Sequence, residues 1–281
     1  MRILFCSDIH GNTLQYFKIF AHAIDYDALI LGGDLCPKGL GEEMSTQREF
    51  LETYLIPNLE ELNNKKPELK IYIMFGNDDY AGNIDILNKH DGSLFELLSS
   101  QLSKLNDNFS IVGYPFVPLT PFSLKDWEKW DLADINQRKK IEIERDIQSH
   151  GIYTWNMKYE GKAFNINDQD SIEKDMEDIF NNIEPEKTLF IFHSPPFNTN
   201  LDVLYTKEHI GSLSIRMAIE KFQPFMTLHG HIHETVEKSG KFIDRIGDTL
   251  CASAGNHNTT SHCFILDIHL STRTIKRIKL E

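Results

Sequence analysis

The sequence has no surplus of basic residues, and this absence excludes one large class of functions. Its 29 Lys and Arg are outnumbered by 42 Asp and Glu, which gives a formal net charge of −13 at pH 7. A protein that holds long nucleic acids needs a basic surface to contact their phosphates. We therefore expect no long nucleic-acid partner. A small phosphorylated substrate remains compatible with the charge, because a bound metal ion can supply positive charge locally.

Cysteines and long apolar runs are scarce as well. The four cysteines (Cys6, Cys36, Cys251 and Cys263) form no C-x-x-C pair, so we expect free thiols. No apolar run approaches the ~20 residues of a membrane-spanning helix. The first residues, MRILFCSDIHG, hold too short an apolar run for a secretory signal. These absences predict a cytoplasmic protein with no membrane partner.

What the chain does contain is an alternation of short apolar runs and amphipathic stretches, typical of an α/β fold with parallel strands. The runs that read as buried strands are 2–6, 28–32, 71–75, 109–113, 188–192 and 225–229. The stretches with helical spacing are 13–24, 44–62, 171–183 and 211–222. At 281 residues we expect one domain spanning residues 1–281.

Two regions depart from this alternation. After residue 230, short runs joined by turns predict antiparallel hairpins that form a second sheet, with strands at 234–238, 241–246, 248–252, 263–269 and 273–279. Residues 115–170 fit neither pattern, since they are rich in proline and aromatics and then in charge. We interpret residues 115–170 as an insertion or lid.

Metal-binding residue types follow the predicted strands. Asp8 and His10 follow the first strand, Asp34 the second, Asn77 with Asp78 and Asp79 the third, His193 the fifth, and the run 229–233 the sixth. The carboxyl ends of parallel strands meet at one edge of a sheet, so these segments converge. Each segment alone is also explained by a turn or a helix cap. Their joint position at one edge favours a binding site.

The types of side chain indicate which ions they would hold. Carboxylate, imidazole and amide oxygen without thiolate favour divalent ions such as Mn, Fe, Zn or Co. With one carboxylate free to bridge, a pair of ions ~3.5–4 Å apart becomes feasible. Such a pair lowers the pKa of a bound water and clamps the oxygens of a phosphoryl group.

The motifs SDIHG (7–11), GGD (32–34), GNDD (76–79), HSPP (193–196) and HGHIHE (229–234) resemble, in order, those of the calcineurin-like metallophosphoesterases. The resemblance implies a four-layer α/β/β/α sandwich of two mixed β-sheets flanked by helices. It also implies two divalent metal ions, with Mn, Fe or Zn expected. One ion would be held by Asp8, His10, Asp34 and His233, and the other by Asp34, Asn77, His193 and His231. His231 and His233 are chosen over His229 because Gly230 precedes His231, as a glycine precedes the family's first ligand there.

The chain departs from the family at position 78, where Asp78 stands in place of a histidine that contacts the phosphate and can protonate the leaving group. An ordinary Asp is ionised at pH 7 and repels phosphate. The resemblance therefore implies a phosphoesterase that uses a metal-bridging hydroxide, with His10, Asn77 and Asp78 at the phosphate and a preference for diesters. A nucleotide pyrophosphohydrolase and a catalytically weak metal-binding scaffold of the same fold remain alternatives. The substrate would be a small phosphorylated molecule, with nucleotides among the candidates.

Three further features have competing interpretations. His229 is interpreted as packing or hydrogen bonding behind the metal ligands. His257 is either a turn residue or a substrate contact. The segment 114–130 either offers aromatic surfaces to a nucleobase and Lys125 to a phosphate, or packs over the sheet by its own aromatics.

Overall fold

The first sheet carries the N-terminal strands. We describe residues 1–38, 43–138, 147–157, 160–257 and 259–281 of a computed structural model. The sheet has the order β16-β15-β1-β2-β3-β4, in which β1 to β4 are parallel and the β15–β16 hairpin adds on antiparallel to β1. Its strands are β1 (Arg2–Cys6), β2 (Ala28–Gly32), β3 (Lys70–Met74), β4 (Glu96–Leu97), β15 (Cys263–His269) and β16 (Thr274–Leu280).

The second sheet has the order β13-β14-β12-β11-β6-β5. Its four central strands are parallel, and its two edge strands run antiparallel to their neighbours. Its strands are β5 (Ser103–Lys104), β6 (Ser110–Tyr114), β11 (Thr188–Phe192), β12 (Met226–His229), β13 (Ile243–Ile246) and β14 (Thr249–Ser253). Both sheets are therefore mixed, as expected.

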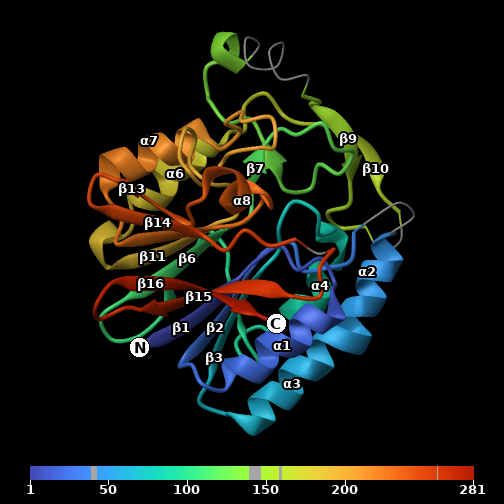
Figure 1. Cartoon of the computed structure of the whole chain (residues 1–281). Coiled ribbons are helices and arrows are strands. Elements are labelled where there is room, and N and C mark those ends of the chain that lie inside the picture. The colour runs from blue at the N-terminus through green and yellow to red at the C-terminus, as the bar shows by residue number, and fades with distance from the viewer. Residues whose placement is uncertain (39–42, 139–146, 158–159, 258) are drawn as a thin grey trace.

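Helices cover the outer face of each sheet (Figure 1). The first sheet is covered by α1 (Thr13–Ala23), a continuous run of α2 (Met44–Phe50), the π-helical η1 (Leu51–Leu55) and α3 (Ile56–Lys65), and the short η2 (Ala81–Asn83) and α4 (Ile84–Asn88). The second sheet is covered by α6 (Ile172–Phe180) and α7 (Leu213–Phe222), with η3 (Pro185–Lys187) before β11 and α8 (Thr235–Ser239) after β12. Within the described residues, no helix combines the length and the apolar character needed to cross a membrane.

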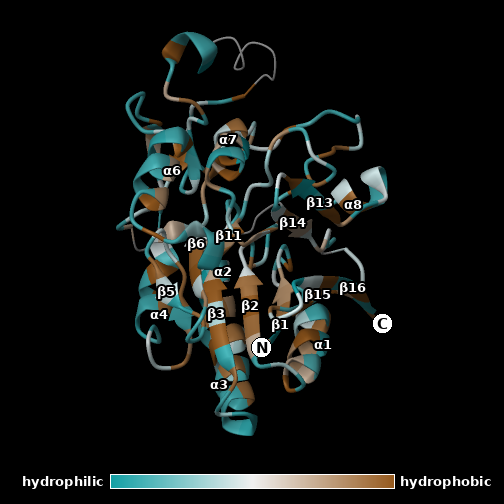
Figure 2. Ribbon diagram, turned by 90° about the vertical axis from the view of Figure 1, so that its left-hand side faces the viewer, coloured by the Kyte–Doolittle hydropathy of each residue, from teal (hydrophilic) through white to brown (hydrophobic). Residues whose placement is uncertain are grey.

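Strand alternation explains the four layers. Successive side chains point to opposite faces of a strand, so Leu4 and Cys6 of β1 pack in the core against the outer helices, while Ile3 and Phe5 pack in the core between the sheets. On the second sheet, Phe190 of β11 packs in a third core with α6 and α7. Figure 2 shows the central strands β1, β2 and β3 coloured as mainly hydrophobic. The predicted α/β/β/α sandwich is confirmed.

The expected C-terminal hairpins are correct in part. The β13–β14 hairpin joins the second sheet, but the β15–β16 hairpin completes the first one. The prediction of a strand at residues 234–238 is wrong, because the helix α8 occupies Thr235–Ser239. This helix ends at Gly240, which has the left-handed conformation (φ 72°). A glycine at this position ends a helix at little steric cost.

The segment 115–170 contains two small strand pairs. They are β7 (Val117–Pro118) with β8 (Glu128–Lys129), and β9 (His150–Tyr153) with β10 (Lys162–Asn165). Residues 139–146 and 158–159 of this segment lie outside the described residues. Figure 1 shows β9 and β10 beyond one end of the two large sheets.

Candidate metal centre and substrate cavity

The predicted ligands lie on loops that leave the carboxyl ends of β1, β2, β3, β11 and β12. Backbone hydrogen bonds join these loops directly. Asp8 N–H donates to Gly33 O at 3.0 Å, His10 N–H to Asp34 O at 2.9 Å, and Gly230 N–H to His193 O at 3.0 Å. The last bond joins loops of two adjacent parallel strands, and the first two join β1 to β2. Strand ends that are far apart in the sequence are thus held at one place.

Four of these residues hold strained backbone conformations. Asp8 (φ 59°), His10 (φ 46°), Asp34 (φ 53°) and His231 (φ 70°) lie in the left-handed region. For a residue with a side chain, such a conformation costs of order 1–3 kcal/mol and persists only where the surroundings enforce it. The concentration of strain at residues of one cluster points to a functional site.

The first ligand group surrounds a small volume. Asp8, His10, Asp34 and His233 each place one ligand atom so that all of these atoms lie within 4.8 Å of one another. His10 Nε2 is 3.0 Å from His233 Nε2 and 3.6 Å from Asp34 Oδ2. His233 Nε2 is 3.8 Å from Asp8 Oδ1. These four residues are the set that the family resemblance assigns to one ion.

The second group meets the first at Asp34. Its carboxylate Oδ2 is 3.3 Å from His193 Nε2. Asn77 Oδ1 is 3.1 Å from the same His193 nitrogen and 2.7 Å from His231 Nδ1. Asp34 therefore lies between the two groups, where a bridging carboxylate is expected. The structure brings together all seven predicted ligands, which we call the ligand cluster: Asp8, His10, Asp34, Asn77, His193, His231 and His233.

The arrangement of donor atoms fits bound cations. Gly32 O lies 3.1 Å from His193 Nδ1, so this nitrogen carries the proton and Nε2 turns its lone pair towards two oxygens. Facing lone pairs repel unless a cation lies among them. His10 Nδ1 is buried and has no hydrogen-bond partner among the described residues, and its Nε2 faces the Nε2 of His233. All four cysteines are buried free thiols outside the cluster, so the donor set is nitrogen and oxygen.

Glycines create the space for this cluster. A Cβ on Gly33 (φ 101°) would lie 2.6 Å from His193 Nδ1, and a Cβ on Gly76 would lie 2.3 Å from Asp34 Oδ1. A Cβ on Gly230 would lie 2.7 Å from Asp8 Oδ2. These distances are shorter than van der Waals contact, so the loops approach the ligands more closely than any other residue type allows.

Burial controls the protonation of the cluster when no ion is bound. Burial lowers the pKa of His10 well below its ordinary value and the pKa of His231 to about 3. Burial also opposes the charged form of His193, but the Asp34 carboxylate outweighs it and raises the pKa of His193 to about 9. Burial would raise the pKa of Asp34, yet His193 and His10 hold it well below its usual range. With no ion bound, a positively charged His193 therefore balances the Asp34 carboxylate.

Asp78 has a partner that the sequence did not reveal. Lys38 Nζ donates to Asp78 Oδ2 at 2.6 Å, and the Asp78 backbone N–H donates to Asp34 Oδ1 at 2.9 Å. Burial, with the nearby Asp34 carboxylate, raises the pKa of Asp78 to about 6, against the opposing effect of Lys38. The negative charge at position 78 is therefore balanced locally. No motif marked Lys38 in advance.

Asp79 and His229 support the cluster from behind. The Asp79 carboxylate accepts hydrogen bonds from the backbone N–H groups of Leu35, Cys36 and Gly76, which fixes the β2 loop against the β3 loop. His229 is fully buried, with Nδ1 3.0 Å from Ser194 O and Nε2 2.8 Å from Thr227 Oγ1. This agrees with the interpretation of His229 as a packing residue.

A cavity of about 830 Å³ opens over the cluster. Asn77, His231 and His233 of the ligand cluster line it, together with Asp78 and Lys38. Its other side, which we call the cavity wall, consists of residues 118–122, Ile147, Phe197, Leu204 and residues 207–210. The cavity is large enough for a drug-sized or nucleotide-sized ligand.

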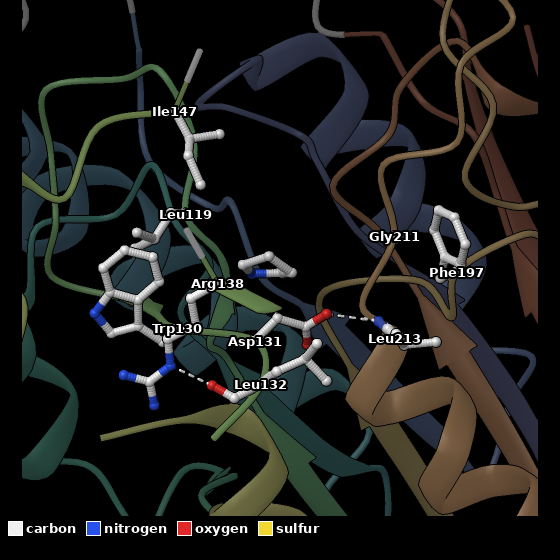
Figure 3. A pocket seen from close by; sticks show the side chains of 10 residues that line it. Leu119, Trp130, Asp131, Leu132, Arg138, Ile147, Phe197, Gly211 and Leu213 are labelled. Carbon is white, nitrogen blue, oxygen red and sulfur yellow. Dashed lines mark hydrogen bonds between the residues drawn. The ribbon is translucent and has the colours of Figure 1, made fainter. Parts of the chain in front are cut away.

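A mainly apolar pocket of about 240 Å³ lies next to the cavity. Figure 3 shows the residues that line this pocket. The pocket shares Pro118, Leu119, Ile147 and Phe197 with the larger cavity. At its far end, Asp131 accepts hydrogen bonds from the backbone of Leu213 and from the Ser212 hydroxyl. A substrate at the metal centre could therefore extend a non-polar group past Phe197.

Lys125 does not face the cavity. Its ammonium is buried, donates to Glu128 Oε2 at 2.6 Å and to Thr120 O at 2.9 Å, and is not among the lining residues. The hypothesis that Lys125 binds a phosphate is wrong, because its charge is already paired inside the segment. His257 lies near the cluster, with its ring centroid 6.0 Å from that of His233 and Nε2 4.0 Å from Glu237 Oε2.

Comparisons with known proteins agree with this geometry. The family model of the calcineurin-like phosphoesterases matches residues 1–235. No curated protein matches the chain. One solved crystal structure superposes with a TM-score of 0.63 at 16% identity, covering 100% of this chain and 99% of its own. The crystal structure of TT1561 of Thermus thermophilus gives a TM-score of 0.58 at 15% identity, covering 100% of this chain and 99% of its own.

The two structural likenesses concern the fold alone, whereas the family model concerns the sequence. Its match runs from β1 through His233 and so includes every member of the ligand cluster. We conclude that this chain belongs to the calcineurin-like phosphoesterase family.

Proposed function

We propose that this protein is a dinuclear metal-dependent phosphodiesterase. Family membership and the candidate ligand cluster support metal-dependent hydrolysis of phosphate esters in general. The observation that carries the finer proposal is that two ligand groups share Asp34 beside a cavity that Asn77, His231 and His233 line. We assign Asp8, His10, Asp34 and His233 to one ion, and Asp34, Asn77, His193 and His231 to the other. Manganese, iron and zinc suit these ligands.

Each part of the site has a task in this proposal. Two bound divalent ions would supply Lewis acidity and lower the pKa of a water molecule towards neutrality. Asp34 holds the two groups of ligands at a fixed separation, and its own position is fixed by the Asp78 backbone N–H. We assign to His10 and Asn77 the orientation of phosphate oxygens; of the two, Asn77 lines the cavity. Asp79 keeps the β2 and β3 loops in register by its three backbone hydrogen bonds.

Position 78 and the cavity favour diesters. A phosphomonoester brings up to two negative charges next to the Asp78 carboxylate, whereas a diester brings one. The Asp78–Lys38 pair tolerates the smaller charge with less repulsion. A diester also has a second ester group, which the apolar pocket past Phe197 can accept. We propose a single domain 1–281 in which the segment 115–170, whose residues 118–122 and Ile147 line the cavity, contributes to substrate binding.

The test is a substrate panel with manganese added. Bis(p-nitrophenyl) phosphate, p-nitrophenyl phosphate and a nucleoside diphosphate sugar are offered to the same preparation, and kcat/KM is measured for each. A phosphodiesterase hydrolyses the first fastest. Preference for the third supports a nucleotide pyrophosphohydrolase, which the second cavity lysine, Lys207, would favour. If the protein binds metal but hydrolyses none of the three substrates, the result supports the alternative of a metal-binding scaffold that has lost activity.

The cellular setting is also part of the proposal. All four cysteines are buried free thiols, as in proteins of a reducing compartment. We propose a cytoplasmic enzyme that acts on a small phosphorylated molecule such as a nucleotide.

A further inference from the structure

A lysine from outside the five motifs lies beside the ligand cluster. Lys38 Nζ is 2.6 Å from Asp78 Oδ2, and the Lys38 side chain is 36% exposed and lines the cavity together with Asn77 and Asp78. The same Asp78 oxygen is 4.0 Å from His10 Nδ1, and the Asp78 backbone N–H donates to Asp34 Oδ1 at 2.9 Å. A single aspartate therefore separates the Lys38 ammonium from two members of the ligand cluster.

The backbone next to Lys38 is fixed relative to the cluster. The buried amide of Gln47 donates from Nε2 to Pro37 O at 3.1 Å and to Asp78 O at 2.8 Å, so one side chain ties the lysine's neighbour to the β3 loop. The loop after β1 packs against the other side of Pro37, because a Cβ on Gly11 would lie 2.4 Å from Pro37 Cγ. Lys38 consequently leaves a loop whose position is set by the loops that carry the ligands.

The charge of Lys38 can act in two ways. An aspartate next to the metal ligands places a negative charge where a phosphate would bind, and the ammonium neutralises this charge. An ammonium also has three N–H donors, so the bond to Asp78 does not exhaust its capacity. Charge-assisted hydrogen bonds from a lysine to phosphate oxygens are strong. The position of Lys38 on the cavity surface favours a direct contact in addition to neutralisation.

We propose that Lys38 is a phosphate-binding residue, whose ammonium is held by Asp78 and donates a hydrogen bond to a phosphate oxygen of the substrate. This rests on the proposed function. The contact holds the phosphate group on the side of the cavity that Asn77 and Asp78 line. It also brings positive charge from the β2 loop to position 78, where the family has a histidine.

The experiment measures the Kd of inorganic phosphate for the zinc-loaded protein by isothermal titration calorimetry. Lys38→Met removes the ammonium and keeps an unbranched side chain, so we expect the Kd to rise about 30-fold. Lys38→Gln repeats the test with a neutral polar side chain if the methionine variant does not fold. An unchanged Kd in either variant would overturn the proposal, and so would a parent protein that binds zinc but no phosphate.

A double variant separates direct contact from neutralisation. Lys38→Met combined with Asp78→Asn removes the cation and the anion together, so the net charge beside the cluster equals that of the parent protein. If Lys38 contacts the phosphate, the Kd of the double variant should stay about 10-fold above the parent value. Phosphate binding as tight as in the parent protein would overturn the proposal, because Lys38 would then act only by neutralising Asp78.

Lys129→Met is the matched control. Lys129 is also a partly buried lysine paired with an aspartate, with Nζ 2.8 Å from Asp175 Oδ2, but this pair lines a separate pocket. The control should leave the Kd of phosphate unchanged. An equal loss of affinity in Lys129→Met would show that only the overall charge of the protein matters, and the proposed contact would be rejected.

Turnover gives a second readout. On bis(p-nitrophenyl) phosphate with manganese, Lys38→Met should lower kcat/KM about 30-fold while the metal content by elemental analysis stays at the parent level. A loss of bound metal would overturn the proposal, since Lys38 would then support the metal ligands. If the parent protein hydrolyses no ester, the proposed function fails. The titration with inorganic phosphate then still decides whether Lys38 contacts a phosphate group.

Discussion

The ligand cluster and the cavity wall face each other across one cavity but are built from different parts of the fold. Members of the cluster follow strands in both sheets, and their loops are joined by backbone hydrogen bonds. The wall consists of loops, residues 118–122 and 207–210 among them, which are held by side-chain carboxylates such as Glu128 and Asp202. Cluster geometry is thus set by the sheets, whereas wall geometry depends on a few buried charged groups. The fixed geometry of the cluster suits the chemical step, whereas the loops of the wall can adapt to the shape of the substrate.

The largest effect is expected at the shared residue of the cluster. Asp34→Asn removes the charge that lies between both ligand groups, so we expect loss of bound metal and a fall in kcat of about 1,000-fold or more. Metal content by elemental analysis and turnover of bis(p-nitrophenyl) phosphate measure the two losses. Asp85→Asn, at a half-exposed carboxylate paired with Arg48, is the control and should retain both. An Asp34→Asn protein with parental turnover would reject the bridging role.

The next effect concerns the wall. Lys125→Met leaves the buried Glu128 carboxylate without its cation, and such a loss destabilises a protein by about 3–5 kcal/mol. The Glu128 carboxylate also accepts hydrogen bonds from the backbone N–H and the hydroxyl of Thr120, which lies in the cavity wall. Because the variant disturbs this part of the wall, the KM for the substrate should rise. Chemical denaturation and steady-state kinetics give the two values.

The pH dependence of this variant has a definite sign. Burial raises the pKa of folded Glu128 to about 7, above its ordinary value of 4.5. The folded state therefore binds more protons than the unfolded state in this interval, and stability falls as pH rises through it. Removing Lys125 steepens that fall, so the deficit of Lys125→Met should shrink towards pH 5. Lys104→Met, at an exposed pair with Asp107, is the control, and an equal deficit there would contradict the role of burial.

A pair of glycine substitutions sharpens the statement that the cluster is set by close packing. Gly33 and Gly92 both have positive φ (101° and 72°), so alanine strains the backbone at either position. At Gly33 the new Cβ would collide, at 2.6 Å from His193 Nδ1, whereas a Cβ on Gly92 would meet no atom of the described part of the chain within 4 Å. We expect Gly33→Ala to cost about 2 kcal/mol more than Gly92→Ala and to weaken metal binding. Equal unfolding free energies would show that the loops can relax.

The smallest expected effect is a gain. Asp78→His restores an imidazole at the phosphate and removes a negative charge, so kcat on phenyl phosphate should rise by about 10-fold, less than an optimally placed acid provides. The ratio of phenyl phosphate to diphenyl phosphate hydrolysis is the measurement. Lys38→Met, which removes the partner of Asp78 without adding an imidazole, should lower that ratio instead. No rise for Asp78→His would mean that charge at position 78 does not limit monoester hydrolysis.

The sequence predicted the cluster well because its residues follow strong apolar strands. β1, β2 and β11 begin and end at the predicted residues, and the predicted ligands lie directly beyond the strands. Within each sheet, parallel strands end at a common edge. Asp8 follows β1 of the first sheet and His233 follows β12 of the second, so their meeting also depends on how the two sheets pack. Periodicity and strand order predicted that these segments follow the strands, whereas the assignment of the ligands, including the choice of His231 and His233, came from the family resemblance.

The wall could not be predicted in the same way. Lys38 and Asp202 lie in loops, where neither periodicity nor spacing indicates which side chains meet. A phosphate contact for Lys125 stayed open beside a packed loop, because the burial of Lys125 against Glu128 depends on how the segment folds back on itself. The error at 234–238 has a similar origin, since a buried Thr235 that donates to Asn200 O fits a helix as readily as a strand.

The place of β1 in its sheet has a consequence for folding. Its neighbours are β2 on one side and β15 on the other, with Arg2 opposite His269. Contacts between residues so distant in sequence form late and slow the search for the native state. Until β15 arrives, β1 exposes an unpaired apolar edge, which is a site for self-association. Refolding yield should therefore depend steeply on protein concentration, and a chain shortened before β15 should aggregate even though it retains every member of the ligand cluster.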